Sequence, residues 1–280
     1  MPKPNQARTK AVQAAEKRLL ELSSKLQKEY YNTVWREISG GITTNKAGSI
    51  KNVTSNKIFV KAWKEIVGKG INYFFKEELN GIEGNSANYY EKFTPKSIDF
   101  DGIKKDVTAK LRSAMSGFMD AYSGSLNVAN STRGFVVGQI ESGVSFADVR
   151  DNAEDFIIGS GGKLGVVDNF NLVQSRVQDT FAEYDRRLSN GYSTALDLNY
   201  FIYQGGEINT TRDFCEERNG NVYTREEGEE WNELVWEGKN TDVNNVLLTA
   251  GGYNCRHYFD CISYELAVQL RPDIQKSKYD

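Results

Sequence analysis

The sequence predicts a mainly α-helical protein with long N-terminal helices and a small α+β unit at its C-terminal end. Apolar residues recur every three or four positions through most of the first 200 residues. Only 4 prolines occur in 280 residues, so long helices are rarely interrupted. From Phe201 onward the pattern changes to short strand-like pieces, glycine pairs and all three cysteines. We therefore expect a helical region over 1–130 and a second domain over 131–280, with the small αβ unit at 201–262.

The apolar spacing places each element in turn. The first helix is expected over about 5–38, because Leu26, Tyr30, Val34 and Ile38 share one face. Ser145 is expected to cap a helix that ends near residue 158. The other predicted helices lie at about 58–79, 103–122, 132–141, 166–188 and 192–200, and the predicted strands at 201–203 and 221–224. The predicted loops or breaks lie at 41–57, 80–97 and 123–131, and a glycine-rich joint between two helices lies at 159–165.

Charge is unevenly distributed along a chain whose formal net charge is −3. Residues 1–29 carry seven basic and three acidic side chains, whereas residues 207–237 carry three basic and ten acidic ones. A solvated helix face is the ordinary explanation of such a basic arm. The alternative is contact with nucleic acid through Lys3, Arg8, Lys10, Lys17 and Arg18. For the acidic run we expect a helix start capped by Thr224, in preference to a Mg²⁺ site or an acid–base pair.

No apolar run approaches the roughly 20 residues that a membrane span needs. The N-terminal residues do not have the pattern of a secretory signal, and an odd number of cysteines does not form a secreted disulfide framework. These observations lead us to expect a protein that folds in a cytosol, with no membrane partner.

The single histidine, His257, excludes every site that needs two histidines. It lies in the last quarter of the chain with Cys215, Cys255 and Cys261, and together they form a full set of zinc ligands by residue type. Three interpretations stay open: structural thiols, which we favour, a Cys215–Cys255 contact or disulfide, and a zinc site. On a strand, Cys255 and His257 would lie roughly 6.5–7 Å apart, so we do not expect them to act as a catalytic pair.

Two short elements give the chain a resemblance to a known family. The first is Thr211-Arg212-Asp213-Phe214-Cys215, followed by Gly220-Asn-Val-Tyr-Thr224, and the second is Gly251-Gly252-Tyr253-Asn254-Cys255-Arg256-His257. This order resembles the C-terminal domain of phage head-morphogenesis proteins, the minor head proteins similar to the F protein of phage Mu. The match covers about 60 residues, with a looser helical match over about 130. The resemblance implies that a structural motif ties the small αβ unit together, through Arg212, Cys215, Gly220, Gly252, Asn254, Cys255, Arg256 and His257.

The resemblance implies a virion component and no enzymatic activity. Such a minor capsid protein is expected in the capsid interior or at the portal vertex, and in the host cytoplasm during assembly. Its expected partners are the portal protein or the major capsid protein, in a symmetric assembly with several copies, and packaged DNA at the basic arm. No cofactor is expected apart from the zinc alternative. The competing hypothesis is a small virion-borne enzyme, a metal-dependent hydrolase or transferase, that uses the Cys, His and Glu residues of the C-terminal unit.

Overall fold

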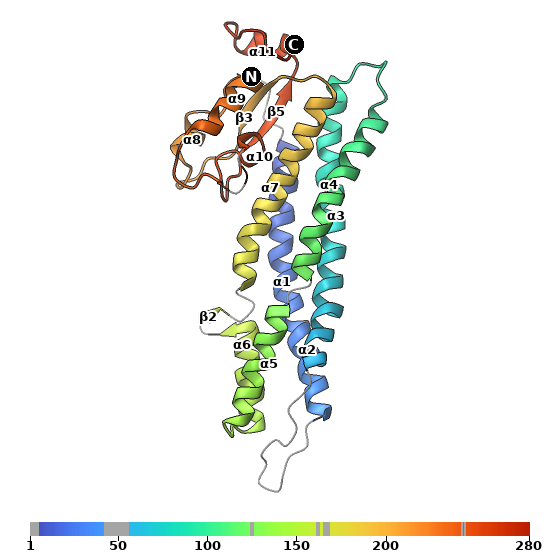
Figure 1. Cartoon of the computed structure of the whole chain (residues 1–280), viewed down its shortest axis with the longest axis vertical. Helices are drawn as coiled ribbons and strands as arrows, with labels where there is room; N and C mark the ends of the chain where they lie inside the picture. Colours follow the sequence, from blue (N-terminus) through green and yellow to red (C-terminus); the bar gives the residue numbers. More distant parts are fainter. Residues whose placement is uncertain are drawn as a thin grey trace. The chain divides into compact units, whose positions relative to one another are not determined.

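The computed structural model describes residues 6–41, 56–123, 126–160, 163–164, 169–241, 243 and 245–280. These residues form a mainly helical protein with a small three-stranded antiparallel sheet in the C-terminal region, which confirms the predicted fold class (Figure 1). Within the described ranges, none of the helices combines the length and the hydropathy that a bilayer span requires. The predicted loop at 41–57 lies almost entirely outside the described residues.

The chain divides into two compact units, and their limits differ from the predicted boundary near residue 130. The sheet unit comprises Met1–Glu16, Glu78–Ala114 and Ser175–Asp280, and the helical unit comprises Lys17–Glu77 and Met115–Gln174. The prediction assumed that each domain is one continuous stretch of chain. Instead, the limits of the units fall inside long helices, so these helices contribute residues to both units.

The helical unit is built from amphipathic helices. It contains the later turns of α1 (Gln6–Gly41), then α2 (Asn56–Ala62), a π-helical stretch (Trp63–Gly68), α5 (Leu126–Glu141), α6 (Phe146–Ile158) and parts of α3 (Lys69–Tyr90), α4 (Phe100–Ser123) and α7 (Asn169–Ala195). The predicted face of α1 is confirmed, because Leu26, Tyr30, Val34 and Ile38 are all buried. Ser145 caps α6 as expected, since its side chain accepts the Asp148 N–H at 3.2 Å. Two very short strands, β1 (Gly159–Ser160) and β2 (Lys163–Leu164), occupy part of the glycine-rich joint.

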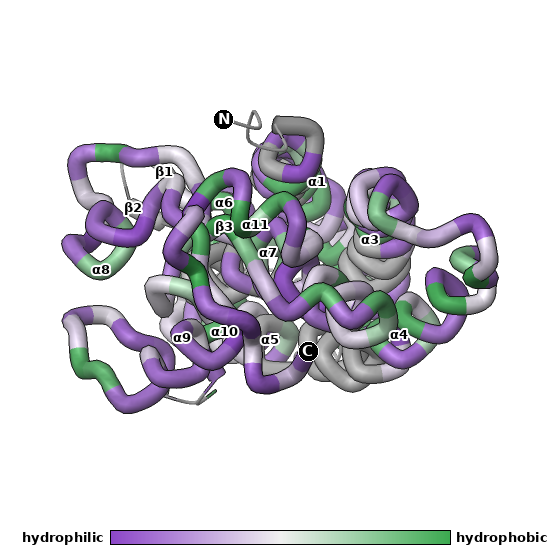
Figure 2. Tube along the Cα trace, turned by 90° about the horizontal axis from the view of Figure 1, so that it is seen from above, coloured by the Kyte–Doolittle hydropathy of each residue, from purple (hydrophilic) through white to green (hydrophobic). Residues whose placement is uncertain are grey.

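The sheet unit contains the three-stranded sheet and several short helices. Strand β3 (Tyr200–Gln204) pairs antiparallel with β4 (Val222–Thr224) on one side and with β5 (Tyr258–Ile262) on the other. The surrounding elements are a 3₁₀ turn (Glu91–Phe93), α8 (Asp213–Glu216), α9 (Arg225–Glu230), a second 3₁₀ turn (Trp231–Glu233), α10 (Val246–Thr249) and α11 (Tyr264–Leu270). Both predicted strands are therefore confirmed. Helix α9, which is hydrophilic along its length (Figure 2), begins with the expected Thr224 cap in a reciprocal capping box with Glu227.

Strand β3 is buried on both faces, because alternate residues point to opposite sides of a sheet. Tyr200 and Ile202 pack with residues of β4, β5 and the C-terminal segment, namely Val222, Ile262, Ala267 and Ile274. On the other face, Phe201 and Tyr203 make edge-to-face contacts with Trp231 and Phe259. The aromatic face of the sheet is the one that holds His257, whose ring stacks on Tyr203 at 5.2 Å between centroids.

Arg8 is the residue that ties the start of α1 into the sheet unit. Its guanidinium is buried and pairs with Asp185 of α7 at 2.8 Å and with Asp260 of β5 at 2.5 Å. It also donates to the Ser189 hydroxyl and to the Phe259 carbonyl oxygen. The expectation that Arg8 contacts nucleic acid is therefore wrong, because no phosphate can reach a guanidinium that two buried carboxylates already surround.

Other differences concern where helices end. Helix α3 continues to Tyr90 through the predicted connector at 80–97, since Leu79, Ile82, Ala87 and Tyr90 extend its buried face. Helix α5 begins at Leu126, inside the predicted break at 123–131. No separate helix forms at 192–200 in the described chain, because α7 runs to Ala195 and β3 starts at Tyr200. Where α3 continues, burial of this face outweighs the local preference of glycine and asparagine for turns.

Candidate functional site

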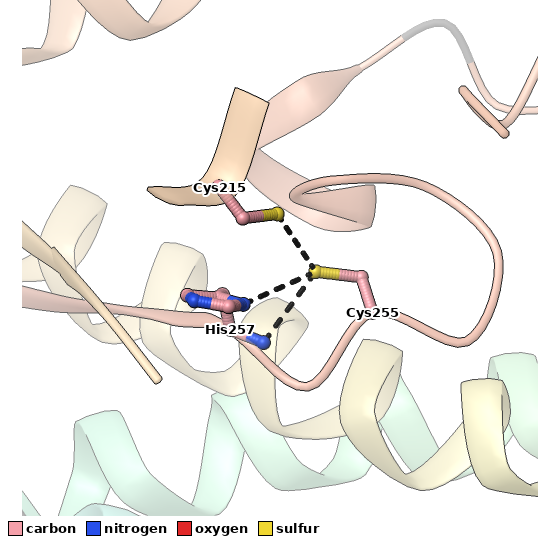
Figure 3. A group of neighbouring side chains, drawn as sticks. All are labelled: Cys215, Cys255 and His257. Carbon is pink, nitrogen blue, oxygen red and sulfur yellow. Dashed lines mark hydrogen bonds between the residues drawn. The ribbon is translucent and has the colours of Figure 1, made fainter. Parts of the chain in front are cut away.

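Three of the four residues that could bind zinc by their residue type lie together in the sheet unit. Cys215 comes from α8, and Cys255 and His257 come from the segment between α10 and β5 (Figure 3). The two Sγ atoms lie 3.8 Å apart, and the Cys255 Sγ lies 3.8 Å from the His257 Nδ1. All three side chains are buried, and their potential ligand atoms lie within 4.8 Å of one another. Cys261 is buried elsewhere, on β5 beside the Tyr90 hydroxyl, so the predicted set of four is wrong as a set.

Of the interpretations left open by the sequence, the structure shows the Cys215–Cys255 contact, and it is a contact between two free, buried thiols. The expectation that Cys255 and His257 stay apart is wrong. Both were placed on a strand, but β5 begins only at Tyr258. Residues 255–257 precede the strand, and there the Cys255 Sγ accepts the His257 N–H at 3.4 Å and lies 3.8 Å from the His257 Nδ1, just after Asn254 with its φ of 58°.

The two glycines of the second element make room for this turn. A Cβ on Gly251 would lie 2.3 Å from the Cys215 Sγ, and one on Gly252 would lie 2.0 Å from the Gly238 carbonyl oxygen. Gly252 also has a φ of 99°, a conformation that other residues rarely adopt. The Trp236 indole N–H donates to the Gly251 carbonyl oxygen at 2.9 Å and fixes the turn from outside.

The two motif arginines hold this region by contacts with other segments. Arg212 donates to the Tyr253 carbonyl oxygen at 2.8 Å. Arg256 lies 3.9 Å from the Glu16 carboxylate of α1. Gly220 closes the turn before β4, where its N–H donates to the Tyr203 carbonyl oxygen at 2.7 Å. The two motif elements are thus connected to each other directly by the Arg212–Tyr253 bond and by the thiol contact.

The sulfur of Cys255 is surrounded by donors. The backbone N–H groups of Gly251 and His257 point to it at 3.2 and 3.4 Å. The hydrogen bond with Cys215, aided by His257, lowers the pKa of the Cys255 thiol, whereas the same bond and burial raise the pKa of Cys215. Cys255 is therefore the thiol that ionises first. Its thiolate is the form that binds metals and attacks electrophiles.

A cavity of about 300 Å³ opens beside the three residues. Its wall contains both motif arginines, two carboxylates from helices and residues of the loop before α8. Among the residues that line it are Glu16, Asp179, Arg212, Cys215, Cys255, Arg256 and His257. Burial raises the pKa of Asp179 to about 6, although the Asn254 N–H donates to its carboxylate at 2.6 Å. A small polar molecule or ion that enters this cavity would meet a thiol pair, a histidine and a carboxyl group that changes charge near neutral pH.

Sequence reasoning missed the contribution of α7 to this site. Asp179 lines the cavity, and Arg186, about two turns further along α7, donates to the carbonyl oxygens of both Cys255 and His257. These two residues lie about 70 positions before the second motif element, and no local pattern connects them to it. Of the predicted arm residues, Lys10, Lys17 and Arg18 are exposed, and Lys3 lies outside the described residues.

Replacing Asp179 with asparagine is expected to stabilise the protein in a pH-dependent way. The pKa of about 6 exceeds the ordinary value near 4, so the ionised carboxyl destabilises the folded state above about pH 6. Asparagine still accepts the Asn254 N–H. Because the side chain is partly solvated, we expect a gain of only about 1 kcal/mol in the free energy of unfolding at about pH 8. The gain should vanish near pH 4 in urea titrations. An equal difference at both pH values would contradict this assignment.

Comparison with known proteins adds no relative to this picture, since no family model, curated protein or solved structure matches the chain.

Proposed function

We propose that this chain is a structural component of a phage virion, a minor head protein that associates with the portal protein or the inner capsid surface. In that place it would assist head assembly or the packaging and delivery of DNA. The observation that carries the proposal is the meeting of the two motif elements. Thr211–Cys215 and Gly251–His257 are separated by 35 intervening residues in the sequence, yet they join through two buried thiols at 3.8 Å.

The packing around these elements supports a structural role in preference to an enzymatic one. Arg212 donates to the Tyr253 carbonyl oxygen, and the absence of a side chain at Gly251 lets the Cys215 Sγ approach its backbone, so both residues serve contacts between the two elements. This is what a motif that ties a small αβ unit together requires. The exposed Lys10, Lys17 and Arg18 of α1 remain as contacts for packaged DNA, through phosphate interactions that weaken as the salt concentration rises.

The cavity supports a second candidate, the small virion-borne enzyme, because it brings Cys255, His257 and Asp179 to one wall. A carboxyl group whose pKa lies near 6 suits proton transfer at neutral pH. The Asp179→Asn variant separates the two candidates, since it preserves the hydrogen bond to Asn254 and removes the acid. A structural protein tolerates this change, whereas an enzyme that relies on the acid does not.

The test is a deletion of the gene in the phage or prophage that carries it. We expect the major capsid protein to be made normally while the yield of infectious, DNA-filled particles falls, and the full chain supplied from a plasmid to restore the yield. The Asp179→Asn chain should restore it equally well. An undiminished yield after deletion would overturn the proposal. Restoration by the wild-type chain but not by a folded Asp179→Asn chain would favour the enzyme.

A further inference from the structure

The geometry of Cys215, Cys255 and His257 points to a metal site. In a tetrahedral zinc centre with Zn–S bonds of about 2.3 Å, two thiolates lie about 3.8 Å apart, and a thiolate and an imidazole nitrogen about 3.6 Å. The corresponding distances here are 3.8 Å between the Sγ atoms and 3.8 Å from the Cys255 Sγ to the His257 Nδ1. The third pair of ligand atoms also falls within the 4.8 Å limit of the group. Two of the three distances between donor atoms thus match those around one tetrahedral ion, and the third lies within 4.8 Å.

The surroundings have the features that orient metal ligands. Two backbone N–H groups donate to the Cys255 Sγ, and the Tyr203 hydroxyl lies 3.2 Å from the Cys215 Sγ. Such hydrogen bonds hold thiolates in place around an ion. The His257 ring is fixed by its stacking on Tyr203, with Nδ1 on the side of the thiols. Arg186 holds the carbonyl oxygens of Cys255 and His257, so the backbone that carries two of the three donors is anchored to α7.

The types of donor select the metal. Two thiolates with one imidazole suit Zn²⁺, whereas Mg²⁺ and Ca²⁺ require oxygen ligands. All three residues lie on the wall of the same cavity of about 300 Å³, so a fourth ligand can approach the ion from that side. Three protein ligands with one open position is the arrangement of zinc sites that bind water or a further ligand.

We propose that Cys215, Cys255 and His257 bind one Zn²⁺ ion, and that its fourth coordination position opens into the cavity lined by Asp179, Arg212 and Arg256. A water molecule or a small anionic group would take this position, because the two arginines supply positive charge on the cavity wall. This site does not depend on the proposed virion role: a chain that binds zinc but never enters particles would refute that role alone.

The experiment measures zinc in the full chain, purified under reducing conditions without chelators, by elemental mass spectrometry. We expect about one Zn²⁺ per chain in the wild type and less than about 0.1 in Cys255→Ser. The matched control is Cys261→Ser, the same exchange at a buried cysteine outside the group, which should retain the full zinc content. Equal zinc contents in both variants, or an absence of zinc in the wild type after growth with added zinc, would overturn the proposal.

Cobalt binding gives a second test, which uses only the wild-type chain and so does not require a variant to fold. The wild-type chain is stripped with a chelator and titrated with CoCl₂ alone. The expected result is a thiolate-to-cobalt charge-transfer band in the near ultraviolet, together with visible bands of a tetrahedral ion, both saturating at about one equivalent and both displaced by ZnCl₂. A spectrum without the charge-transfer band would overturn the site. So would a Cys215–Cys255 disulfide, located by peptide mapping, in the chain as isolated and before any chelator treatment.

Discussion

Replacing Arg8 with alanine is expected to lower the free energy of unfolding by about 3–5 kcal/mol, the range measured when one partner of a buried ion pair is removed. The change leaves the Asp185 and Asp260 carboxylates buried without their counter-ion. Gln204 and Ser86 also donate to these carboxylates, but they carry no charge. The loss is measured by urea denaturation of the full chain, followed by circular dichroism.

Lys10→Ala is the matched control for Arg8→Ala. Lys10 lies two positions further along the same helix and is exposed. Its loss should change the free energy of unfolding by less than about 0.5 kcal/mol. Arg8→Lys is expected to fall between these two, because an ammonium group keeps the charge but cannot fork onto two carboxylates. If Arg8→Ala proved as stable as Lys10→Ala, the buried cluster and the place of α1 in the sheet unit would both be wrong.

Replacing Gly252 with alanine is expected to have an effect of similar size, about 3 kcal/mol or more. The backbone at φ 99° is strained for any residue with a Cβ, which costs about 1–3 kcal/mol. The new methyl would also lie 2.0 Å from the Gly238 carbonyl oxygen, a backbone atom that cannot move away alone, and overpacking of this kind costs about a further 1–3 kcal/mol.

Two other glycines separate these contributions. Gly220 has a positive φ of 81°, and a Cβ added there would meet no atom within 4 Å, so Gly220→Ala should show the backbone cost alone. Gly206 has neither feature, and Gly206→Ala should change the free energy of unfolding by less than about 0.5 kcal/mol. The order of destabilisation is therefore Gly252, then Gly220, then Gly206. A Gly252→Ala protein as stable as Gly206→Ala would show that the loop does not hold Cys255 in the described place.

The fold could be predicted from the sequence wherever local periodicity and burial agree. The face of α1 at Leu26–Ile38, the Ser145 cap and the Thr224 cap were all predicted correctly for this reason. Helix ends were predicted poorly, since Gly81 and Gly84 indicate a turn while Ile82 and Ala87 continue a buried helical face.

The site could be predicted only in part. The scarcity of cysteine and histidine singled out Cys215, Cys255 and His257 as a group, together with Cys261, which the structure places elsewhere. Arg8 could not be assigned, because its acidic partners lie 177 and 252 residues away and an arginine on a basic helix is normally solvated. Asp179 and Arg186 were missed for the same reason. Long-range pairing of polar groups leaves no periodic signal in one sequence.

The most direct test of the central proposal, a structural role in the virion, is to look for the chain in particles. Heads filled with DNA are purified on a density gradient from the strain that carries the gene, and peptides of this chain and of the major capsid protein are quantified by mass spectrometry. The proposal predicts that the chain is present in every preparation, in a fixed ratio well below that of the major capsid protein. A chain that is abundant in the lysate but absent from the purified heads would contradict it.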